Sequence, residues 1–235
     1  MKRFFAFTLA ETLVVIGIIG IISALTLPNL NSSTGEKEKV VSLQKTYSEL
    51  IEAISRAEIV YGPVGTWHLA GNSDNTNSIV VERIREFLKV SKFCGTTNPD
   101  NCFVYKIQQN NTMPTFILAS GASILFSGVS NNCQKLNTTD VLNYCGTFLI
   151  DVDGPNKGKN VQAYDQFDFI LTEENGLVPR GRERSDYNTA TSCIGWHGEC
   201  AEWVMNYGNM DYLKTDSSGK CPNGKILSAT VTSCK

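Results

Sequence analysis

An apolar run near the N-terminus constrains the fold of this chain more than any other feature. No ionisable side chain occurs between Glu11 and Glu36, and the basic residues Lys2 and Arg3 precede the run. With a rise of about 1.5 Å per residue, a helix over residues 7–27 is as long as the ~30 Å hydrocarbon core of a bilayer. The basic start predicts an N-terminus that stays in the cytoplasm while the rest of the chain is exported.

An acidic residue, Glu11, lies inside this predicted membrane helix and needs an explanation. A cleaved signal peptide or a plain signal anchor accounts for the basic start and the apolar length, but not for a carboxylate there. An ionised side chain within a membrane helix costs roughly 2.5–3.5 kcal/mol on insertion scales and is usually paired. Cleavage between Ala6 and Phe7 would create a new amino group four residues before Glu11. The amino group of one subunit would then neutralise the carboxylate of the next.

Residues 6–11 read Ala-Phe-Thr-Leu-Ala-Glu and closely resemble the processing site of type IV prepilins and type II secretion pseudopilins. In that family a short basic leader and a small residue, most often glycine, precede Phe-Thr-Leu-x-Glu at the start of an apolar helix. The resemblance implies that a prepilin peptidase cleaves between Ala6 and Phe7. It also implies that Phe7 is then N-methylated.

The resemblance further implies which residues act in assembly and where the protein resides. Glu11 would contact the amino group of a neighbouring subunit, Thr8 belongs to the same motif, and Pro28 falls where these helices often carry a kinking proline. The implied partners are homologous pilin or pseudopilin subunits, the prepilin peptidase and an assembly platform in the inner membrane. Before assembly the protein would cross the inner membrane once, and afterwards it would belong to a periplasmic or extracellular filament.

A second apolar pattern follows the first. From Val40 to Ala57, apolar side chains recur at spacings of three and four, which predicts an amphipathic helix with one buried face. The polar residues 29–35 are expected to loosen the helix, and the Tyr-Gly-Pro sequence at 61–63 is expected to end it. We therefore divide the chain into a leader (1–6), a hydrophobic membrane or filament-core helix (7–30), the amphipathic half of the helix (31–60) and a globular head (61–235).

The head is predicted to be α+β, with an antiparallel sheet. Helices are expected over residues 80–90 and 199–213, and Ser120-Gly121 is typical of a hairpin turn. The predicted strands cover residues 103–108, 115–119, 122–129, 148–152, 167–172 and 226–232. With the resemblance, this gives a pilin-like fold, in which a long N-terminal helix packs on the sheet of a disulfide-bonded head.

Eight cysteines follow the apolar segment, and an even number in an exported domain indicates a disulfide framework. Eight cysteines allow 105 pairings, so the connectivity does not follow from the number alone. Close neighbours along the chain favour four small loops. The pairs predicted in this way are Cys94–Cys102, Cys133–Cys145, Cys193–Cys200 and Cys221–Cys234.

The segment 151–165 gathers oxygen ligands of the kind that calcium prefers. Its Asp-x-Asp-Gly start is similar to an EF-hand loop, but the remaining ligand positions and the closing Glu do not match. Some pseudopilins carry a calcium site in a loop of the head, and this segment resembles that site in placement and composition. Calcium ligands would then be Asp151, Asp153, Asn156 and Asp165. The simpler interpretation, which we favour, is a turn whose Asp side chains cap their own backbone.

No catalytic motif is evident, and we predict that the chain is not an enzyme. It has two histidines, no nucleophile elbow and no Gly-rich phosphate loop. Cys193 and Cys200 enclose His197, but zinc would need a fourth ligand nearby, and an exported cysteine pair is more often oxidised.

The charge of the chain gives no reason to expect a nucleic-acid partner. The formal net charge is −2, so no overall field attracts phosphates. Arg180, Arg182 and Arg184 form one basic cluster, but Glu183 dilutes it, which favours a solvated loop.

Two hypotheses for the function remain open. In the first, the chain is a structural subunit, a minor pilin or pseudopilin, that polymerises through its N-terminal helix into a type IV pilus or a type II secretion filament. In the second, it is an exported binding domain, or an enzyme, that uses the helix only as a membrane tether. The two differ in the fate of the leader, because the second predicts a mature chain that keeps Met1.

Overall fold

The structure is a computed structural model that describes residues 9–67, 76–95, 102–104, 113–128, 133–196 and 199–235. The side chains of residues 23–33, 76–78 and 195–196 lie outside this description as well. The chain divides into two compact units, residues 1–38 and residues 39–235. The boundary falls inside the predicted amphipathic half of the helix, so the head unit includes the helix from Lys39 onward.

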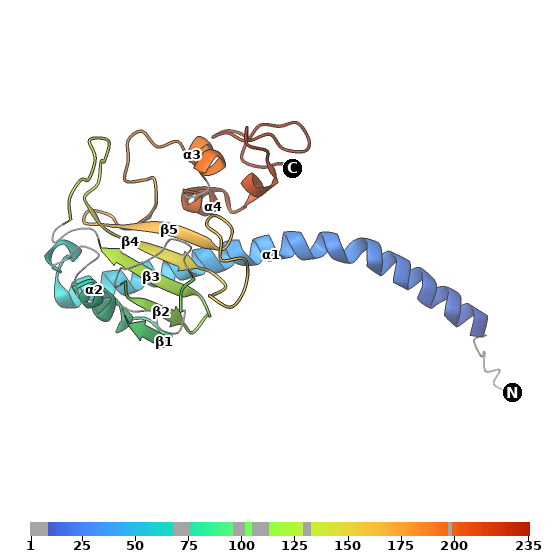
Figure 1. The fold of residues 1–235 in the computed structure, drawn as a ribbon, viewed down its shortest axis with the longest axis horizontal. Helices are drawn as coiled ribbons and strands as arrows, with labels where there is room; N and C mark the ends of the chain where they lie inside the picture. The colour runs from blue at the N-terminus through green and yellow to red at the C-terminus, as the bar shows by residue number, and fades with distance from the viewer. Residues whose placement is uncertain (1–8, 68–75, 96–101, 105–112, 129–132, 197–198) are drawn as a thin grey trace. The chain divides into compact units, whose positions relative to one another are not determined.

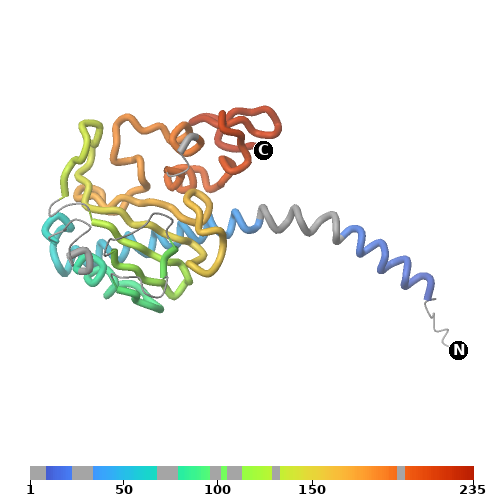
Figure 2. Tube along the Cα trace, viewed as in Figure 1, coloured from blue at the N-terminus to red at the C-terminus, as the bar shows by residue number. Residues whose placement is uncertain are grey.

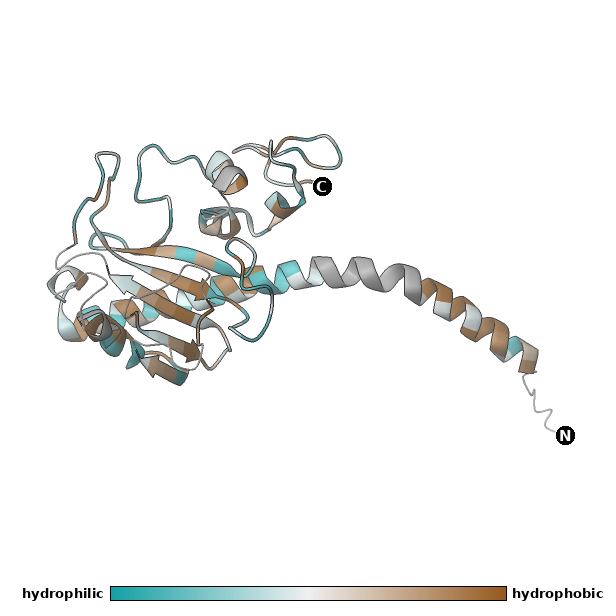
Figure 3. Cartoon of the chain, in the orientation of Figure 1, coloured by the Kyte–Doolittle hydropathy of each residue, from teal (hydrophilic) through white to brown (hydrophobic). Residues whose placement is uncertain are grey.

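Helix α1 (Leu9–Tyr61) contains 53 residues, begins in the first unit and ends in the second. The helix includes residues 29–35, so the loosening expected there is wrong. Between Leu9 and Ile22 the large apolar side chains are all more than half exposed. Figure 3 colours most of this part of the helix as hydrophobic. The consecutive Val14, Val15 and Ile16 are 60%, 54% and 66% exposed. Because successive residues point about 100° apart around a helix, this part of α1 is apolar on all sides and not along one stripe.

The head half of α1 is amphipathic, as the spacing predicted. Its buried stripe comprises Val40, Leu43, Leu50, Ala53, Ile54 and Ala57. Gly62 follows the last residue of the helix with a φ of +83°, and its N–H donates a 2.9 Å hydrogen bond to the carbonyl of Glu58. A glycine in this conformation, followed by proline, ends the helix where it was expected.

The head contains a six-stranded antiparallel sheet whose strands lie in chain order, each beside the next (Figure 1). This arrangement shows the α+β class, because the sheet follows the long helix in sequence. The strands are β1 (Val90–Gly95), β2 (Thr115–Leu118), β3 (Ser123–Gly128), β4 (Tyr144–Asp151), β5 (Gln166–Thr172) and β6 (Gly176–Pro179). Gly121, with a φ of +94°, occupies the turn between β2 and β3, as predicted.

Both faces of the sheet are covered. On one face Phe126, Phe148 and Phe169 lie side by side across β3, β4 and β5, and they share the main core with the stripe of α1. Tyr47 of α1 packs on Phe169, with ring centroids 5.0 Å apart. Because neighbouring residues of a strand point to opposite faces, the other face carries a different set. There a second cluster is formed by Phe103, Met113, Leu125 and Leu149.

The smaller helices lie before and after the sheet (Figure 1). Before it are η1 (Val64–Thr66) and α2 (Thr76–Arg85), and after it are α3 (Thr189–Trp196), α4 (Ala201–Tyr207) and η2 (Asp211–Lys214). The helix predicted over 80–90 is therefore displaced, since α2 ends at Arg85 and β1 begins at Val90. Of the strand predicted over 103–108, residues 103 and 104 are not in a strand, and 105–108 lie outside the described residues.

Two predictions for the C-terminal part of the chain are wrong. The single helix over 199–213 is divided, because Gly208 adopts a left-handed conformation (φ 62°) after α4 and the chain restarts as η2. The strand over 226–232 does not form, and one isolated bridge joins Lys220 to Ile226. Figure 2 shows this segment, coloured red, as irregular loops near the C-terminus.

Four disulfides cross-link the head. They join the cysteine pairs predicted from the sequence spacing: Cys94–Cys102, Cys133–Cys145, Cys193–Cys200 and Cys221–Cys234. The last pair closes the C-terminal loops, with Cα atoms 5.5 Å apart. A disulfide lowers the conformational entropy of the unfolded chain. It therefore stabilises a segment that has little regular secondary structure of its own.

Candidate functional site

The residues predicted to be processed or to act in assembly lie at the start of α1, except Pro28, which lies further along the helix. Ala6, Phe7 and Thr8 are outside the described residues, and the same is true of the side chain of Pro28. Glu11 is exposed and lies in the first turn of α1. A carboxylate there interacts favourably with the helix dipole.

The exposed apolar surface of α1, which we define as the side chains of residues 9–22, is the first candidate site. It surrounds the helix and carries Glu11 near its N-terminal end. Among the described residues, none forms a helix that is both long and apolar enough to span a membrane. Chemically, this surface can associate with other apolar surfaces.

The acidic segment 151–165 is the second candidate site, and its carboxylates mostly bind their own backbone. Asp165 Oδ2 accepts hydrogen bonds from the N–H groups of Lys159 and Asn160, at 2.6 Å and 2.9 Å. The N–H of Val161 donates to the other oxygen at 2.5 Å. Asp165 is therefore the cap of a tight turn, as the simpler sequence interpretation proposed.

Asp151 and Asp153 also have partners within the head. Asp151 accepts hydrogen bonds from the N–H of Gly154 at 2.9 Å and from Nε2 of Gln166 at 3.0 Å. Asp153 pairs with the ammonium group of Lys39. Burial raises the pKa of Asp151 to about 7; the hydrogen bond from Gln166 opposes this shift, and the charges of the two nearby aspartates add to it.

Close packing holds this turn together. A Cβ on Gly158 would lie 2.4 Å from Oδ2 of Asp165 and 2.7 Å from Oδ2 of Asp153, and the φ of Gly158 is +64°. Any other residue at position 158 would therefore meet both a steric clash and an unfavourable backbone conformation. The glycine lets the two carboxylates approach the turn.

The arrangement does not favour calcium. Asn156 is exposed and Asp165 already accepts three backbone hydrogen bonds, while calcium takes six to eight oxygen ligands. Two buried oxygens of the turn, Oδ1 of Asp153 and Oδ1 of Asn160, have no hydrogen-bond partner. The part of the chain that the structure describes contains no group of three or more His, Cys, Asp or Glu side chains placed to hold a metal ion. Calcium at this loop therefore stays a hypothesis.

The three arginines of the basic cluster are not simply solvated, as the sequence suggested, because each contacts a carboxylate. Arg182 lies 3.3 Å from Glu202 of α4, and Arg184 lies 3.0 Å from Asp186. The third, Arg180, lies 3.7 Å from the buried Asp168 of β5. These pairs hold the chain after β6 against β5 and α4, so the cluster has no excess of positive charge for a phosphate.

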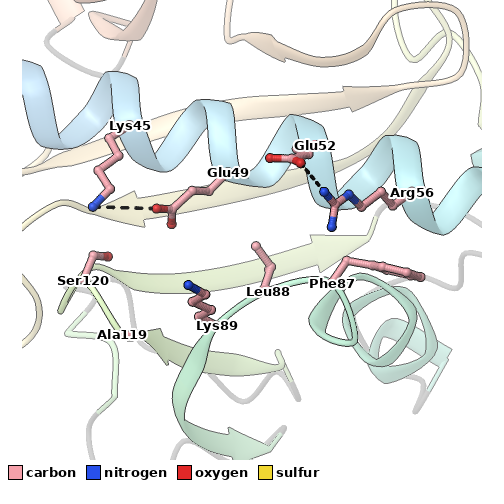
Figure 4. Close-up of a pocket in the computed structure, with 9 residues that line it drawn as sticks. All are labelled: Lys45, Glu49, Glu52, Arg56, Phe87, Leu88, Lys89, Ala119 and Ser120. Carbon is pink, nitrogen blue, oxygen red and sulfur yellow. Dashed lines mark hydrogen bonds and ion pairs between the residues drawn. The ribbon is translucent and has the colours of Figure 1, made fainter.

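A groove of about 500 Å³ lies between α1 and the segment that enters β1 (Figure 4). Along α1, Lys45 pairs with Glu49 at 3.8 Å, and Arg56 pairs with Glu52. Across the groove are the side chains of Phe87, Leu88, Lys89, Ala119 and Ser120. The charges of its helical wall compensate one another. No local sequence pattern indicates this groove, because its two walls are far apart along the chain.

Comparison of the chain with protein-family models, with curated proteins and with solved structures finds no match in any of the three.

Proposed function

We propose that the chain is a structural subunit, similar to a minor pilin or pseudopilin, that is processed at its N-terminus and polymerises through α1. The observation that carries this proposal is the exposed apolar surface of α1 (residues 9–22), which surrounds the helix and has Glu11 in its first turn. Fully burying an Ile, Leu or Val side chain contributes roughly 1.5–3 kcal/mol, so a helix with this surface has a strong tendency to associate.

The composition of the surface supports a bundle of like helices in particular. A helix that packs on one partner needs one apolar stripe, whereas a helix surrounded by lipid or by several neighbours is apolar on all sides. In the inner membrane the surface would face lipid, and in the filament it would face the helices of other subunits. The move from lipid to filament then exposes little apolar area to water.

Glu11 supports the same proposal, because a carboxylate beside an apolar surface is costly unless it meets a cation. Removal of residues 1–6 supplies one, the new amino group of Phe7, in each subunit. The head, with its four disulfides, would form the outer surface of the filament in an oxidising compartment.

The experiment that tests the proposal is intact-mass spectrometry of the chain extracted from the membranes of cells that express a prepilin peptidase. We expect loss of residues 1–6 and the added mass of one methyl group on Phe7. Cells without the peptidase provide the control and should yield the uncleaved chain. A mature chain that keeps Met1 in both strains would contradict the proposal and favour the tethered binding domain.

A further inference from the structure

A small pocket opens on the face of the sheet that points away from α1. It has a volume of about 140 Å³, and its apolar lining comes from Met113, Leu125 and Leu149. The pairing of Leu125 with Leu149, and of Leu149 with Asp168, brings a carboxylate of β5 onto the same face. The other lining side chains are Ser127, Thr147 and Arg180. The pocket thus combines an apolar floor with hydroxyls and one pair of opposite charges.

The carboxylate of Asp168 is buried but incompletely bonded. Its side chain is 8% exposed. Oδ2 accepts a hydrogen bond of 3.1 Å from Nε2 of Gln162, while Oδ1 has no hydrogen-bond partner. A buried acceptor without a partner costs free energy comparable to a lost hydrogen bond, so such atoms in a folded protein need an explanation. The carboxylate of Asp168 therefore keeps acceptor capacity for a donor that enters the pocket.

Arg180 provides the complementary group. Its Nη1 lies 3.7 Å from Oδ2 of Asp168, which is an ion pair but too long for a hydrogen bond. Within the described residues, its guanidinium donates no hydrogen bond to a protein acceptor. The side chain is 38% exposed, so its donors are accessible. The pocket therefore offers acceptor capacity on the Asp168 carboxylate beside unused donors on the Arg180 guanidinium. The negative charge of the first and the positive charge of the second cancel.

The chemistry of the pocket selects a compact neutral ligand. The opposite charges of Asp168 and Arg180 nearly cancel, so an ion of either sign gains little net attraction. Adjacent hydroxyl groups, in contrast, can donate to the carboxylate and accept from the guanidinium. The volume is smaller than the ~300–1,000 Å³ of pockets for drug-sized ligands, which limits the occupant to about one ring. The apolar floor suits the C–H face of such a ring.

We propose that this pocket binds one sugar ring through two neighbouring hydroxyl groups, one donating to Asp168 and one accepting from Arg180. Thr147 supports the polar wall, because its hydroxyl is held by the hydroxyl of Tyr144. The ring is either a free monosaccharide or the terminal residue of a glycan. The proposal concerns the head alone and does not depend on filament assembly.

The test is ligand-observed saturation-transfer NMR on the full-length chain in a detergent without a sugar headgroup. The probes are glucose, galactose, mannose and N-acetylglucosamine at millimolar concentration, each also as the terminal residue of a disaccharide. Ethylammonium and acetate are the charged probes. We expect at least one sugar to bind and neither ion to do so. Binding of the disaccharide as well would identify a glycan end as ligand, and binding of the monosaccharide alone would identify a free sugar.

The pocket variants are Asp168→Leu and Arg180→Met, and the matched controls are Asp186→Leu and Arg56→Met, which alter exposed ion pairs elsewhere on the head. We expect either pocket variant to weaken sugar binding about tenfold or more, because each removes a charge-assisted hydrogen bond. The controls should bind as the wild type does. The proposal is overturned if no sugar binds, if an ion binds in its place, or if both folded pocket variants bind normally.

Discussion

The hydroxyl of Tyr47 in α1 donates a 3.0 Å hydrogen bond to the carbonyl oxygen of Leu177 in β6. These residues are 130 positions apart, and the bond joins the helix to the last strand of the sheet. The ring of Tyr47 also packs on Phe169 of β5. Tyr47 therefore fixes the helix on the sheet by both a polar and an apolar contact.

Removal of the Tyr47 hydroxyl should destabilise the head without disrupting its core. For Tyr47→Phe we expect the free energy of unfolding to fall by about 1 kcal/mol, the net contribution of a typical hydrogen bond. Tyr47→Ala should cost roughly 3–5 kcal/mol, because it also leaves a cavity. Urea denaturation followed by tryptophan fluorescence measures both values. The control, Tyr61→Phe, removes a hydroxyl whose hydrogen bond to Glu86 is exposed, so it should change stability little. An equal loss there would contradict the assignment.

The Asp165 cap should be among the most sensitive acidic positions. Asp165→Asn leaves an amide that cannot accept all three backbone hydrogen bonds of residues 159–161, and we expect a loss of about 3 kcal/mol. Asp216→Asn provides the matched control, since Asp216 also caps backbone N–H groups but at an exposed turn. We expect the control to lose about 1 kcal/mol or less. Equal losses in thermal scans of the two variants would show that burial of the cap is unimportant.

Calcium should not stabilise the head, because all carboxylate oxygens of Asp151, Asp153 and Asp165 except Oδ1 of Asp153 already have partners. A ligand that binds only the folded state must raise the thermal midpoint. We therefore expect the same midpoint in millimolar calcium and in chelator, with magnesium as the control for ionic strength. A rise specific to calcium that disappears in Asp153→Asn would establish the site that the resemblance implied.

The sequence predicted those parts of the fold that depend on local patterns. The three- and four-residue spacing from Val40 to Ala57 located the buried face of α1, and Gly62 located its end. Strand β6 escaped prediction because it has four residues and ends in Pro179, a residue that strands usually exclude. Tertiary contacts and Cys221–Cys234 stabilise the C-terminal loops, so their apolar residues gave a false strand signal.

For the candidate sites too, the sequence predicted what depends on local patterns and not what depends on tertiary contacts. The Asp165 cap was predictable, since Asp side chains in turns often bond their own backbone. The approach of Arg180 to Asp168 was not, because it depends on the register that pairs Phe169 with Pro179 in the β5–β6 hairpin. That register cannot be predicted from the spacing of residues along the chain.

The head should become less stable as the pH rises through the range of about 4 to 7. Burial raises the pKa of Asp168 to about 6, with Arg180 and Gln162 opposing the shift and Glu199 adding to it, and the pKa of Asp151 rises to about 7. The folded state therefore holds these protons more tightly than the unfolded state does. The free energy of unfolding is then greatest at a pH below the pKa of these groups in the unfolded chain, and it falls as the pH rises through their pKa in the folded protein. For Asp168 alone the loss is roughly 3 kcal/mol at most.

Thermal midpoints between pH 4 and pH 8 measure this effect. Asp168→Asn cannot ionise, so it should flatten the profile and be more stable than the wild type at pH 8. Asp186→Asn serves as control, because the hydrogen bond with Arg184 lowers the pKa of Asp186. The contribution of Asp186 to stability is therefore already present above pH 4 and changes little between pH 4 and pH 8. A wild-type midpoint that rises steadily to pH 8 would contradict the raised pKa values.

Replacement of Glu11 should separate insertion from assembly. In Glu11→Gln the chain keeps its apolar surface, so we expect normal membrane insertion and normal removal of residues 1–6. The amino group of Phe7 would then lie in an apolar filament core without its carboxylate. Breaking a buried ion pair by removing one partner costs about 3–5 kcal/mol, which corresponds to a loss of filaments of about 100-fold or more.

Glu38→Gln, at an exposed position further along the same helix, is the matched control and should assemble normally. Filaments sheared from cells and counted by electron microscopy provide the measurement, with immunoblots of the membrane fraction to show equal insertion. If Glu11→Gln forms as many filaments as Glu38→Gln, the carboxylate does not pair with a neighbouring subunit.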